Sequence, residues 1–338
     1  MDSSPRPATS KQQLPHPALT PWRDALAGLR GADLLSLASL SRTQVLALLE
    51  LAAAVKGDIA PFSTVMQGKS GVLLFEKPSL RTRMSFEVGV HKLGGHAIYM
   101  DHSAQRLGER ESVTDYGKNL ERWVDLIVAR VFRNSVIVEL AAAARVPVVN
   151  ALCDLYHPCQ ALADFFTLFE RSGRTGEDLR RVKLAYVGDG NNVAHSLMHG
   201  AAILGVELVV ITPEGHAPEA DIVAESRLLA AKNASPEPRV SASPDDVKGA
   251  AAVYTDVWVS MGESAHSASE RRKFNKYQVN EALMAKAGPD AVFMHCLPAK
   301  RGQEVTDGVM DSPLNVAYDQ AENRMHAQNA LLSAIFGV

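Results

Sequence analysis

The chain has 338 residues, of which 46% are hydrophobic and 22% charged, a composition typical of a globular protein with enough apolar material for two cores. Its formal net charge of -3 lacks the basic excess expected of a protein that binds nucleic acid or an acidic membrane surface. No apolar run reaches the roughly 18 residues that a membrane-spanning helix needs.

The first 23 residues contain five prolines, several serines and threonines, and no apolar segment of the kind found in a secretory signal. An organelle transit peptide is an alternative, although the prolines oppose an amphipathic helix. We expect residues 1–28 to form a mobile extension. The three cysteines, Cys153, Cys159 and Cys296, form no CxxC pair, which argues against a disulfide framework or a cysteine-rich zinc site and favours a reducing, cytoplasmic location.

After residue 30, short apolar runs alternate with helical patterns, which predicts βαβ units and parallel sheets. The runs form two series of four, so we expect an α/β fold of two doubly wound domains, each with a central parallel sheet flanked by helices. The domains are predicted at 29–157 and 158–319, with a closing helix at 320–338 that completes the first. The expected strands are Val72–Glu76, His96–Met100, Leu126–Val131, Pro147–Ala151, Lys183–Val187, Glu207–Thr212, Ala251–Asp256 and Ala291–Leu297.

The first strand is followed by a segment in which two hydroxyls and two arginines meet a predicted helix start near Thr82. Free backbone N–H groups and the helix dipole attract an anion there, and arginine fits phosphate oxygens. The segment therefore predicts a phosphate site without a glycine-rich loop; N-capping hydroxyls with surface arginines are the alternative. The residues are Ser79, Leu80, Arg81, Thr82 and Arg83.

The third and fourth strands end in further polar groups. Arg130 lies inside an apolar strand, where it needs a ligand oxygen or a buried carboxylate as partner. His157 and Gln160 flank the helix start expected at Pro158. A histidine can polarise a carbonyl and a glutamine can accept from an amide, although a lone histidine is more often structural.

In the second half, Gly188–Asn192 follows a strand but lacks the last glycine of a dinucleotide fingerprint, so a bound NAD is a weak hypothesis. Its asparagines could recognise an amino acid, or serve the turn itself. Asp256 and Ser260 bring an acid and a hydroxyl together, and Cys296 ends the last main strand. Arg324, on the closing helix, is a further anion ligand or a surface ion-pair partner.

Three of these elements resemble signatures of the aspartate/ornithine carbamoyltransferase superfamily: Ser79–Arg83, His157-Pro158-Cys159-Gln160 and His295-Cys296-Leu297-Pro298. Their order and spacing also agree, and the resemblance covers roughly residues 30–338. Three positions depart from the common pattern, because Leu80 and Cys159 stand where threonine is frequent and Lys300 where histidine is frequent.

The subfamily is indicated by the segment Asp256–Gly262, which is similar to the ornithine-binding loop of ornithine carbamoyltransferases, and by HCLP in place of HPLP. The resemblance implies transfer of the carbamoyl group of carbamoyl phosphate to L-ornithine, giving citrulline and phosphate, in arginine or urea-cycle metabolism. It also implies a homotrimer or a multiple of trimers, with active sites at subunit interfaces. We expect no metal, no cofactor and no nucleic-acid or membrane partner.

The resemblance also implies roles for individual residues. The catalytic set is Arg130, His157, Cys296 and Asp256. The carbamoyl-phosphate set is Ser79, Leu80, Arg81, Thr82, Arg106, Arg130, His157, Pro158, Cys159, Gln160, Cys296, Leu297 and Arg324. The ornithine set is Asn192, Asp256, Ser260 and Met261. For the contact with the neighbouring subunit, Gln105 and Arg106 are alternatives, and we favour Arg106 by its distance from Gly108.

Three competing hypotheses remain beside this prediction. The acceptor could be another amine, such as an acylated ornithine or putrescine, which the Ser260–Gly262 segment disfavours. The chain could be an inactive homologue that acts as a binding partner, which the complete set of arginines, His157 and Cys296 disfavours. An NAD-binding protein is the third hypothesis, and the incomplete glycine fingerprint opposes it.

Overall fold

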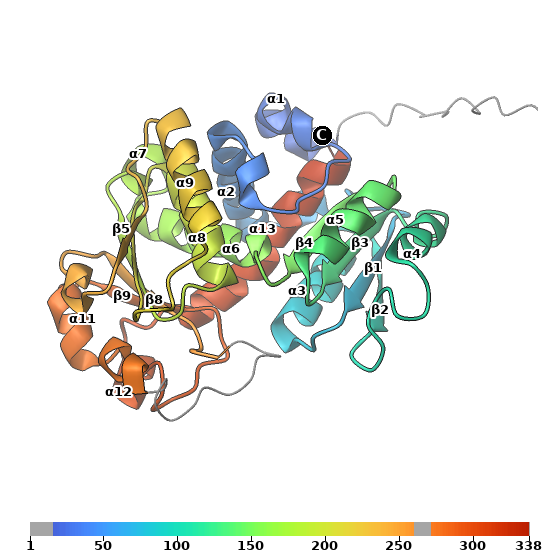
Figure 1. The fold of residues 1–338 in the computed structure, drawn as a ribbon. Coiled ribbons are helices and arrows are strands. Elements are labelled where there is room, and N and C mark those ends of the chain that lie inside the picture. Colours follow the sequence, from blue (N-terminus) through green and yellow to red (C-terminus); the bar gives the residue numbers. More distant parts are fainter. Residues whose placement is uncertain (1–15, 260–271, 338) are drawn as a thin grey trace, which may run out of the picture.

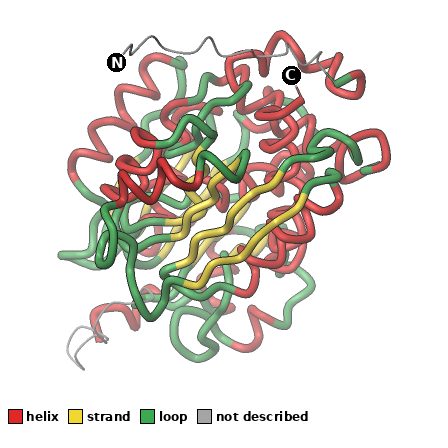
Figure 2. Tube along the Cα trace, turned by 90° about the vertical axis from the view of Figure 1, so that its right-hand side faces the viewer, coloured by secondary structure: helices red, strands yellow, loops and turns green. Residues whose placement is uncertain are grey.

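The computed structural model describes residues 16–259 and 272–337, which contain two parallel β-sheets with helices packed around them (Figures 1 and 2). The first sheet has the strand order β2-β1-β3-β4 and the second the order β7-β6-β5-β8-β9. Every pairing between neighbouring strands is parallel, which confirms the predicted fold class. The strands are β1 (Ser70–Phe75), β2 (His96–Asp101), β3 (Leu126–Arg130), β4 (Val148–Leu152), β5 (Lys183–Val187), β6 (Glu207–Ile211), β7 (Arg239–Ser241), β8 (Ala252–Thr255) and β9 (Val292–His295).

The eight predicted strands are all present, and their ends move by at most two residues. β3, β8 and β9 are buried along their whole length: each begins with an apolar run and ends in a buried polar residue, which is Arg130, Thr255 or His295. The ninth strand, β7, was not predicted. It has three residues and lies at the sheet edge with its side chains largely exposed, so it carries no apolar run that a sequence pattern could reveal.

Helices connect the strands, as the parallel pairing demands. Local signals set their ends: α6 begins at Pro158, and Gly173 terminates it in the left-handed conformation, with φ 112°. The helices of the first half are α1 (Arg23–Leu26), α2 (Arg42–Gly57), α3 (Leu80–Lys92), α4 (Val113–Leu120) and α5 (Asn134–Ala143). Those of the second half are α6 (Pro158–Ser172), α7 (Gly176–Leu179), α8 (Asn192–Leu204), α9 (Ala220–Lys232), α11 (Glu281–Ala287) and α12 (Asp307–Met310).

The last helix, α13 (Ala317–Gly337), starts beside β9 of the second sheet and runs back along α6, α2 and α3 of the first half (Figure 1). Most of its residues are buried, on all faces, because it lies between other helices. It begins three residues before the closing helix predicted at 320–338. α13 thus connects the two halves, and none of the helices within 16–259 and 272–337 is both long and apolar enough to cross a membrane.

The segment before α2 packs on the first half. Residues 17–29 form short helical turns in which Leu19 and Leu26 have no exposed surface, and the His16 N–H donates to the carbonyl of Gly337 over 2.6 Å. This part of the predicted extension is therefore held against the core. Residues 1–15 lie outside the described residues.

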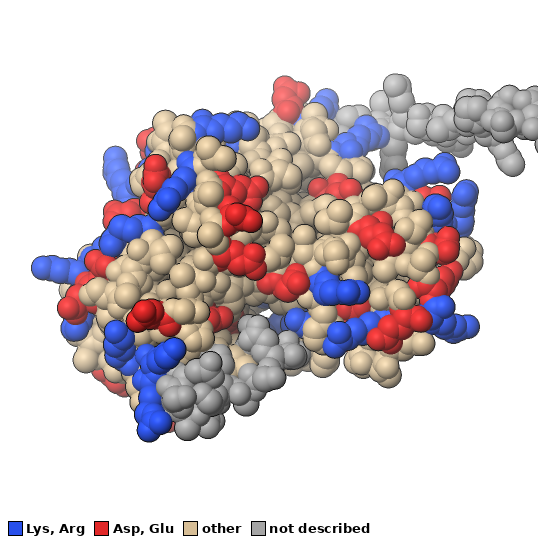
Figure 3. Space-filling model, in the orientation of Figure 1, with Lys and Arg blue, Asp and Glu red and all other residues tan. Residues whose placement is uncertain are grey.

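Acidic and basic side chains are interspersed on the face shown in Figure 3, in keeping with the small net charge. A surface on which both signs of charge are interspersed creates no strong long-range attraction for a polyanion such as nucleic acid.

Candidate active site

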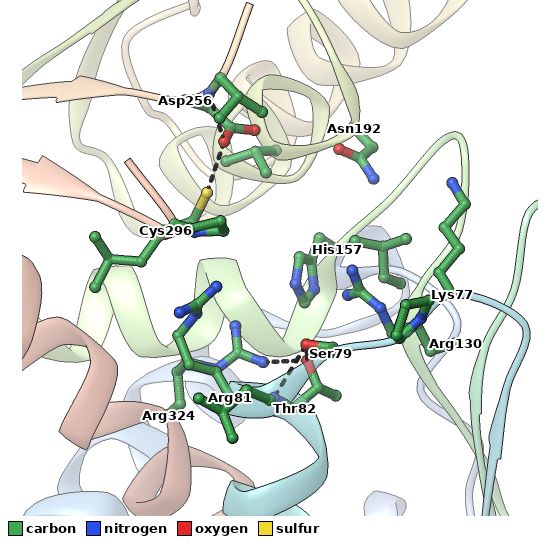
Figure 4. Close-up of a pocket in the computed structure, with 17 residues that line it drawn as sticks. Lys77, Ser79, Arg81, Thr82, Arg130, His157, Asn192, Asp256, Cys296 and Arg324 are labelled. Atoms are coloured by element: carbon green, nitrogen blue, oxygen red, sulfur yellow. Dashed lines mark hydrogen bonds between the residues drawn. The ribbon is translucent and has the colours of Figure 1, made fainter. Parts of the chain in front are cut away.

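A cavity of about 280 Å³ lies where the carboxyl ends of the two sheets face each other. Residues at the ends of β1, β3, β4, β8 and β9 line it, together with the first turns of α3 and α8 and one residue of α13 (Figure 4). This is the position that open α/β sheets use for ligands. The structure brings eleven predicted site residues together here: Ser79, Leu80, Arg81, Thr82, Arg130, His157, Asn192, Asp256, Cys296, Leu297 and Arg324.

One wall of the cavity is the start of α3. Ser79 is the N-cap residue: its hydroxyl accepts from the Thr82 N–H over 3.3 Å and lies 3.0 Å from the Thr82 hydroxyl. Ser79 therefore caps the helix and also lines the cavity, so the two alternatives considered for this segment do not exclude each other. The first N–H groups of a helix have no partner within it, so those of Leu80 and Arg81 are suited to an anion. The helix begins at Leu80, two residues earlier than expected.

Three arginines converge on this wall from three different elements: Arg81 from α3, Arg130 from β3 and Arg324 from α13 (Figure 4). Burial, with the nearby charges of Arg324 and Arg81, lowers the pKa of Arg130 from 12.5 to about 9. The Nε atoms of Arg130 and Arg324 are buried without a hydrogen-bond partner among the described residues. The buried guanidinium groups of Arg130 and Arg324, beside the half-buried Arg81, favour a ligand that carries negative charge and several acceptor oxygens.

His157 lies between the arginines and the second half of the chain. Its backbone N–H donates to the Ser196 hydroxyl over 2.8 Å, and its Nδ1 is buried without a partner among the described residues. Burial, with the charges of Arg324 and Arg130, lowers the imidazole pKa well below 6.5. The ring is therefore neutral near pH 7 and suited to donate a hydrogen bond to a polarised oxygen.

Three predicted residues stand behind the cavity instead of lining it. Pro158 is the first residue of α6, and the buried thiol of Cys159 donates to the carbonyl of Asn150 over 3.5 Å. Gln160 accepts from Nη1 of Arg324, while Arg324 Nη2 donates to the Thr82 hydroxyl over 2.7 Å. Gln160 therefore fixes an arginine of the wall.

Asp164 supports Gln160 in turn, and the sequence analysis missed it. Its Oδ1 accepts from the amides of Gln160, over 2.7 Å, and Gln320, over 2.6 Å, which ties α6 to α13. Burial raises the pKa of Asp164 to about 7, although both amides and the Arg324 charge act in the opposite direction. An acid between the apolar neighbours Leu162 and Phe165 was the available signal.

The opposite wall is built on Asp256 and Cys296 (Figure 4). The Cys296 thiol donates to Asp256 Oδ1 over 2.9 Å, and Asn191 Nδ2 donates to Asp256 Oδ2 over 2.8 Å. Burial and the adjacent Asp256 raise the pKa of Cys296 well above 9. The thiol is accordingly a neutral donor, not a thiolate nucleophile.

The two asparagines after β5 have different positions. The side chain of Asn191 caps α8 by accepting from the N–H groups of Val193 and Ala194. Of the two roles considered for these asparagines, Asn191 therefore has the structural one, in the turn before the helix. Asn192 lines the cavity, and its Nδ2 donates to the carbonyl of Cys153 over 2.6 Å. The predicted ligands Ser260 and Met261 lie outside the described residues.

Three neighbouring side chains on this wall are of the kinds that bind metal ions. Asp256, His295 and Cys296 have ligand atoms within 4.8 Å of one another. However, both ring nitrogens of His295 have protein partners: Nδ1 accepts from the Leu297 N–H, and Nε2 lies 3.3 Å from Glu304 Oε1. These contacts leave the imidazole no free lone pair for a metal.

Arg106 does not line the cavity. It is exposed, and its guanidinium lies over the Phe132 ring at 4.0 Å, with the ammonium of Lys77 at 4.5 Å from the same ring. Lys77 does line the cavity and was missed, although its place directly after the first strand was a usable signal. The other lining residues not predicted are Pro78, Leu152, Val193, Val257 and Pro298.

Comparisons with known proteins agree over nearly the whole chain. Residues 32–170 match the model of the aspartate/ornithine carbamoyltransferase carbamoyl-P binding domain, and residues 180–335 match that of the Asp/Orn binding domain. An ornithine carbamoyltransferase of Shewanella oneidensis is 52% identical over 302 residues, which are 89% of this chain and 98% of that protein. An anabolic ornithine carbamoyltransferase of Pyrococcus furiosus is 44% identical over 314 residues, covering 92% of this chain and 98% of the relative.

Solved structures show the same similarity. The ornithine carbamoyltransferase structure from Pyrococcus furiosus superimposes with a TM-score of 0.86 at 44% identity, covering 91% of this chain and 98% of the other. That from Thermus thermophilus gives a TM-score of 0.78 at 40% identity, covering 90% and 98%.

Proposed function

The chain belongs to the aspartate/ornithine carbamoyltransferase family, and we propose on this premise that it transfers the carbamoyl group of carbamoyl phosphate to L-ornithine, giving L-citrulline and phosphate. The observation that carries the proposal is the cavity itself. Arg81, Arg130 and Arg324 supply positive charge on one wall, and Asp256 supplies negative charge on the other. A dianion and an amine can thus be bound face to face.

The proposed division of labour follows the two halves of the chain. Residues 29–157, completed by 320–338, would bind carbamoyl phosphate, and residues 158–319 would bind ornithine. The two matched family models, described as carbamoyl-P binding and Asp/Orn binding, support this division. Both halves contribute to the cavity, so the substrates would meet between them.

The phosphate would lie at the start of α3. Ser79 and Thr82 offer hydroxyls, Leu80 offers its backbone N–H, and Arg81 offers a guanidinium. In this arrangement position 80 would contribute only its backbone N–H, which leucine supplies as well as threonine, so the missing hydroxyl would cost little. The large exposed side chain of Leu80 does not enter this contact.

The carbamoyl group would lie next to Arg130, His157 and Arg324. Arg130 and the neutral imidazole of His157 would donate to the carbonyl oxygen, where negative charge grows as the amine adds. Backbone groups of Cys296 and Leu297 would bind the carbamoyl nitrogen. Gln160 would share in this contact or act through Arg324; Pro158 and Cys159 would hold the helix start.

Ornithine would be held by Asn192, Asp256, Ser260 and Met261. Its side-chain amine has an ordinary pKa of about 10.4, like that of lysine, and must be neutral to attack the carbamoyl carbon. The new C–N bond forms and the bond from carbon to the bridging phosphate oxygen breaks. The proton that the attacking amine loses ends on the departing phosphate, which leaves as HPO4²⁻. Asp256 and Cys296 would orient the amine.

We further propose a homotrimeric, cytoplasmic enzyme of arginine biosynthesis. Leu80, Met84 and Ile98, on α3 and the edge strand β2, leave 73%, 49% and 42% of their surface exposed, which supports a subunit interface on this side. Arg106 would reach the active site of the neighbouring subunit. Light scattering should then give three times the chain mass, or a multiple of it.

The decisive test is citrulline formation by the purified protein from carbamoyl phosphate and L-ornithine. N-acetylornithine, putrescine and L-aspartate serve as competing acceptors under the same conditions. A strong preference for ornithine is the expected result. Preference for another amine would overturn the acceptor, and no turnover with any of them would favour the inactive-homologue hypothesis.

A further inference from the structure

Two buried polar side chains, His295 and Glu304, lie behind the cavity wall that carries Cys296 and Leu297. His295 ends β9, and Glu304 follows nine residues later, on the turn after this wall. They are 1% and 0% exposed, and His295 Nε2 lies 3.3 Å from Glu304 Oε1. Neither lines the cavity, so any influence on a ligand must pass through the residues between.

The hydrogen bonds fix the state of the imidazole. The Leu297 N–H donates to His295 Nδ1 over 2.8 Å, so Nδ1 must be an unprotonated acceptor. The ring proton therefore lies on Nε2, where it is donated to the Glu304 carboxylate. The same Oε1 also accepts from the Lys300 N–H over 2.5 Å. Glu304 thus selects the tautomer that can hold Leu297.

This contact orients the peptide group that faces the cavity. In the trans peptide between Cys296 and Leu297 the carbonyl points opposite to the N–H, hence away from the His295 ring. Leu297 has a φ of 58°, a conformation that persists in a non-glycine residue only when its surroundings hold it. The His295 backbone is also anchored, because its N–H donates to Gln320 Oε1 over 2.9 Å.

We propose that His295 and Glu304 are positioning residues, which fix the Cys296–Leu297 peptide so that its groups recognise the carbamoyl end of the donor substrate. The inference rests on the proposed function and deepens it. The phosphate end is bound on the other wall, by the start of α3 and Arg81. Loss of the His295 contact should therefore weaken recognition of a carbamoyl group and leave recognition of phosphate intact.

Two substitutions of His295 distinguish the contribution of the Nδ1 contact with Leu297 from that of the Nε2 contact with Glu304. His295→Asn keeps an acceptor oxygen near the Nδ1 position but does not reach Glu304. His295→Gln keeps a polar group near the Nε2 position but offers no acceptor to the Leu297 N–H. The probes are phosphonoacetamide, in which a methylene replaces the bridging oxygen of carbamoyl phosphate, and inorganic phosphate. Titration calorimetry on the full-length protein measures both affinities.

The expected result is a difference between the two ligands. His295→Gln should weaken phosphonoacetamide binding by about tenfold or more, because misplacing a ligand-binding group by an ångström has effects of this order. Phosphate affinity should stay within about twofold of that of the wild type. His295→Asn should recover a large part of the lost affinity, since it restores the acceptor for Leu297.

Glu304→Gln tests the second residue and is close in shape to the wild type. A glutamine amide can accept from Nε2–H or donate to Nε2, so it no longer selects one tautomer. Phosphonoacetamide should bind about threefold to tenfold more weakly, with phosphate again unchanged. Wild-type affinity for phosphonoacetamide in this variant would overturn the role of Glu304.

The remaining outcomes are also decisive. Equal losses for both ligands, or equal losses in the Asn and Gln variants, would mean a general structural role and would overturn the proposal. A wild-type protein that binds phosphate but not phosphonoacetamide would instead overturn the proposed carbamoyl-phosphate activity. The two failures are thus distinguishable.

Discussion

The backbone N–H of His157 donates to the hydroxyl of Ser196 over 2.8 Å, which links the β4–α6 loop to α8. The Ser196 hydroxyl donates in turn to the carbonyl of Asn192, over 3.0 Å, and Asn192 Nδ2 donates to the carbonyl of Cys153. The imidazole of His157, which we propose polarises the carbonyl, is therefore held in part by α8, whose first residue, Asn192, is a proposed ornithine ligand. Movement of α8 would displace His157.

Ser196→Ala should lower kcat for citrulline formation by about tenfold. The change leaves a buried N–H without its acceptor, which costs about 1–3 kcal/mol, and frees the loop that positions His157. The KM for carbamoyl phosphate should change less, because the phosphate contacts lie on α3. Steady-state kinetics with both substrates measures the two effects.

Ser226→Ala is the matched control. Ser226 lies on α9, has no exposed surface, and its hydroxyl has no partner among the described residues. The Ser226→Ala variant therefore loses a buried serine hydroxyl in the same half of the chain as Ser196, but the loop that holds His157 is unaffected. Equal kinetic losses in both variants would show that the Ser196 contact has no specific role.

Arg81→Ala should raise the KM for carbamoyl phosphate by about tenfold or more and lower kcat as well. A charge-assisted hydrogen bond contributes about 1.5–3 kcal/mol, which corresponds to roughly tenfold to 100-fold in affinity. Arg145→Ala is the control, since its side chain is 81% exposed and its ion pair with Glu121 lies outside the cavity. Wild-type kinetics in the Arg81 variant would refute the phosphate assignment.

The sequence predicted the strands, and the part of the site that follows them, because both depend on local order. A continuous apolar run identifies a buried parallel strand, and its polar successor faces the ligand edge. Ser79, Arg130 and Cys296 were found by this rule. β7 was missed because three largely exposed residues at a sheet edge have no apolar pattern.

The supporting residues could not be predicted in the same way, because their partners are distant in sequence. Asp164 and Gln320 are 156 positions apart and meet only because α13 packs on α6. Ser196 meets His157 across 39 positions. Arg106 was predicted from its spacing to Gly108, and within the chain its guanidinium packs on the ring of Phe132.

Cys296 should react slowly with iodoacetamide at pH 7, because the thiolate is the nucleophile and burial beside Asp256 raises its pKa well above 9. The rate should rise about tenfold per pH unit through pH 9, without a plateau. Mass spectrometry of peptides distinguishes this site from Cys153 and Cys159, and the urea-unfolded protein gives the reference rates. Rapid alkylation that is already maximal at pH 7 would mean a thiolate at this site.

Asp164→Asn should stabilise the protein more at pH 8 than at pH 5. Burial raises the pKa of Asp164 from 3.8 to about 7, so between these values the folded state holds a proton that the unfolded state has lost. Stability therefore falls as pH rises from about 4 to about 7, by at most about 4 kcal/mol at roughly 1.4 kcal/mol per pKa unit. Asparagine has no charged form to desolvate, and its carbonyl oxygen can still accept from Gln160 and Gln320.

Urea unfolding at pH 5 and pH 8 measures the change, with the surface variant Asp307→Asn as control. A difference between variant and wild type that does not grow with pH would mean that Asp164 is ionised in the folded protein across this range.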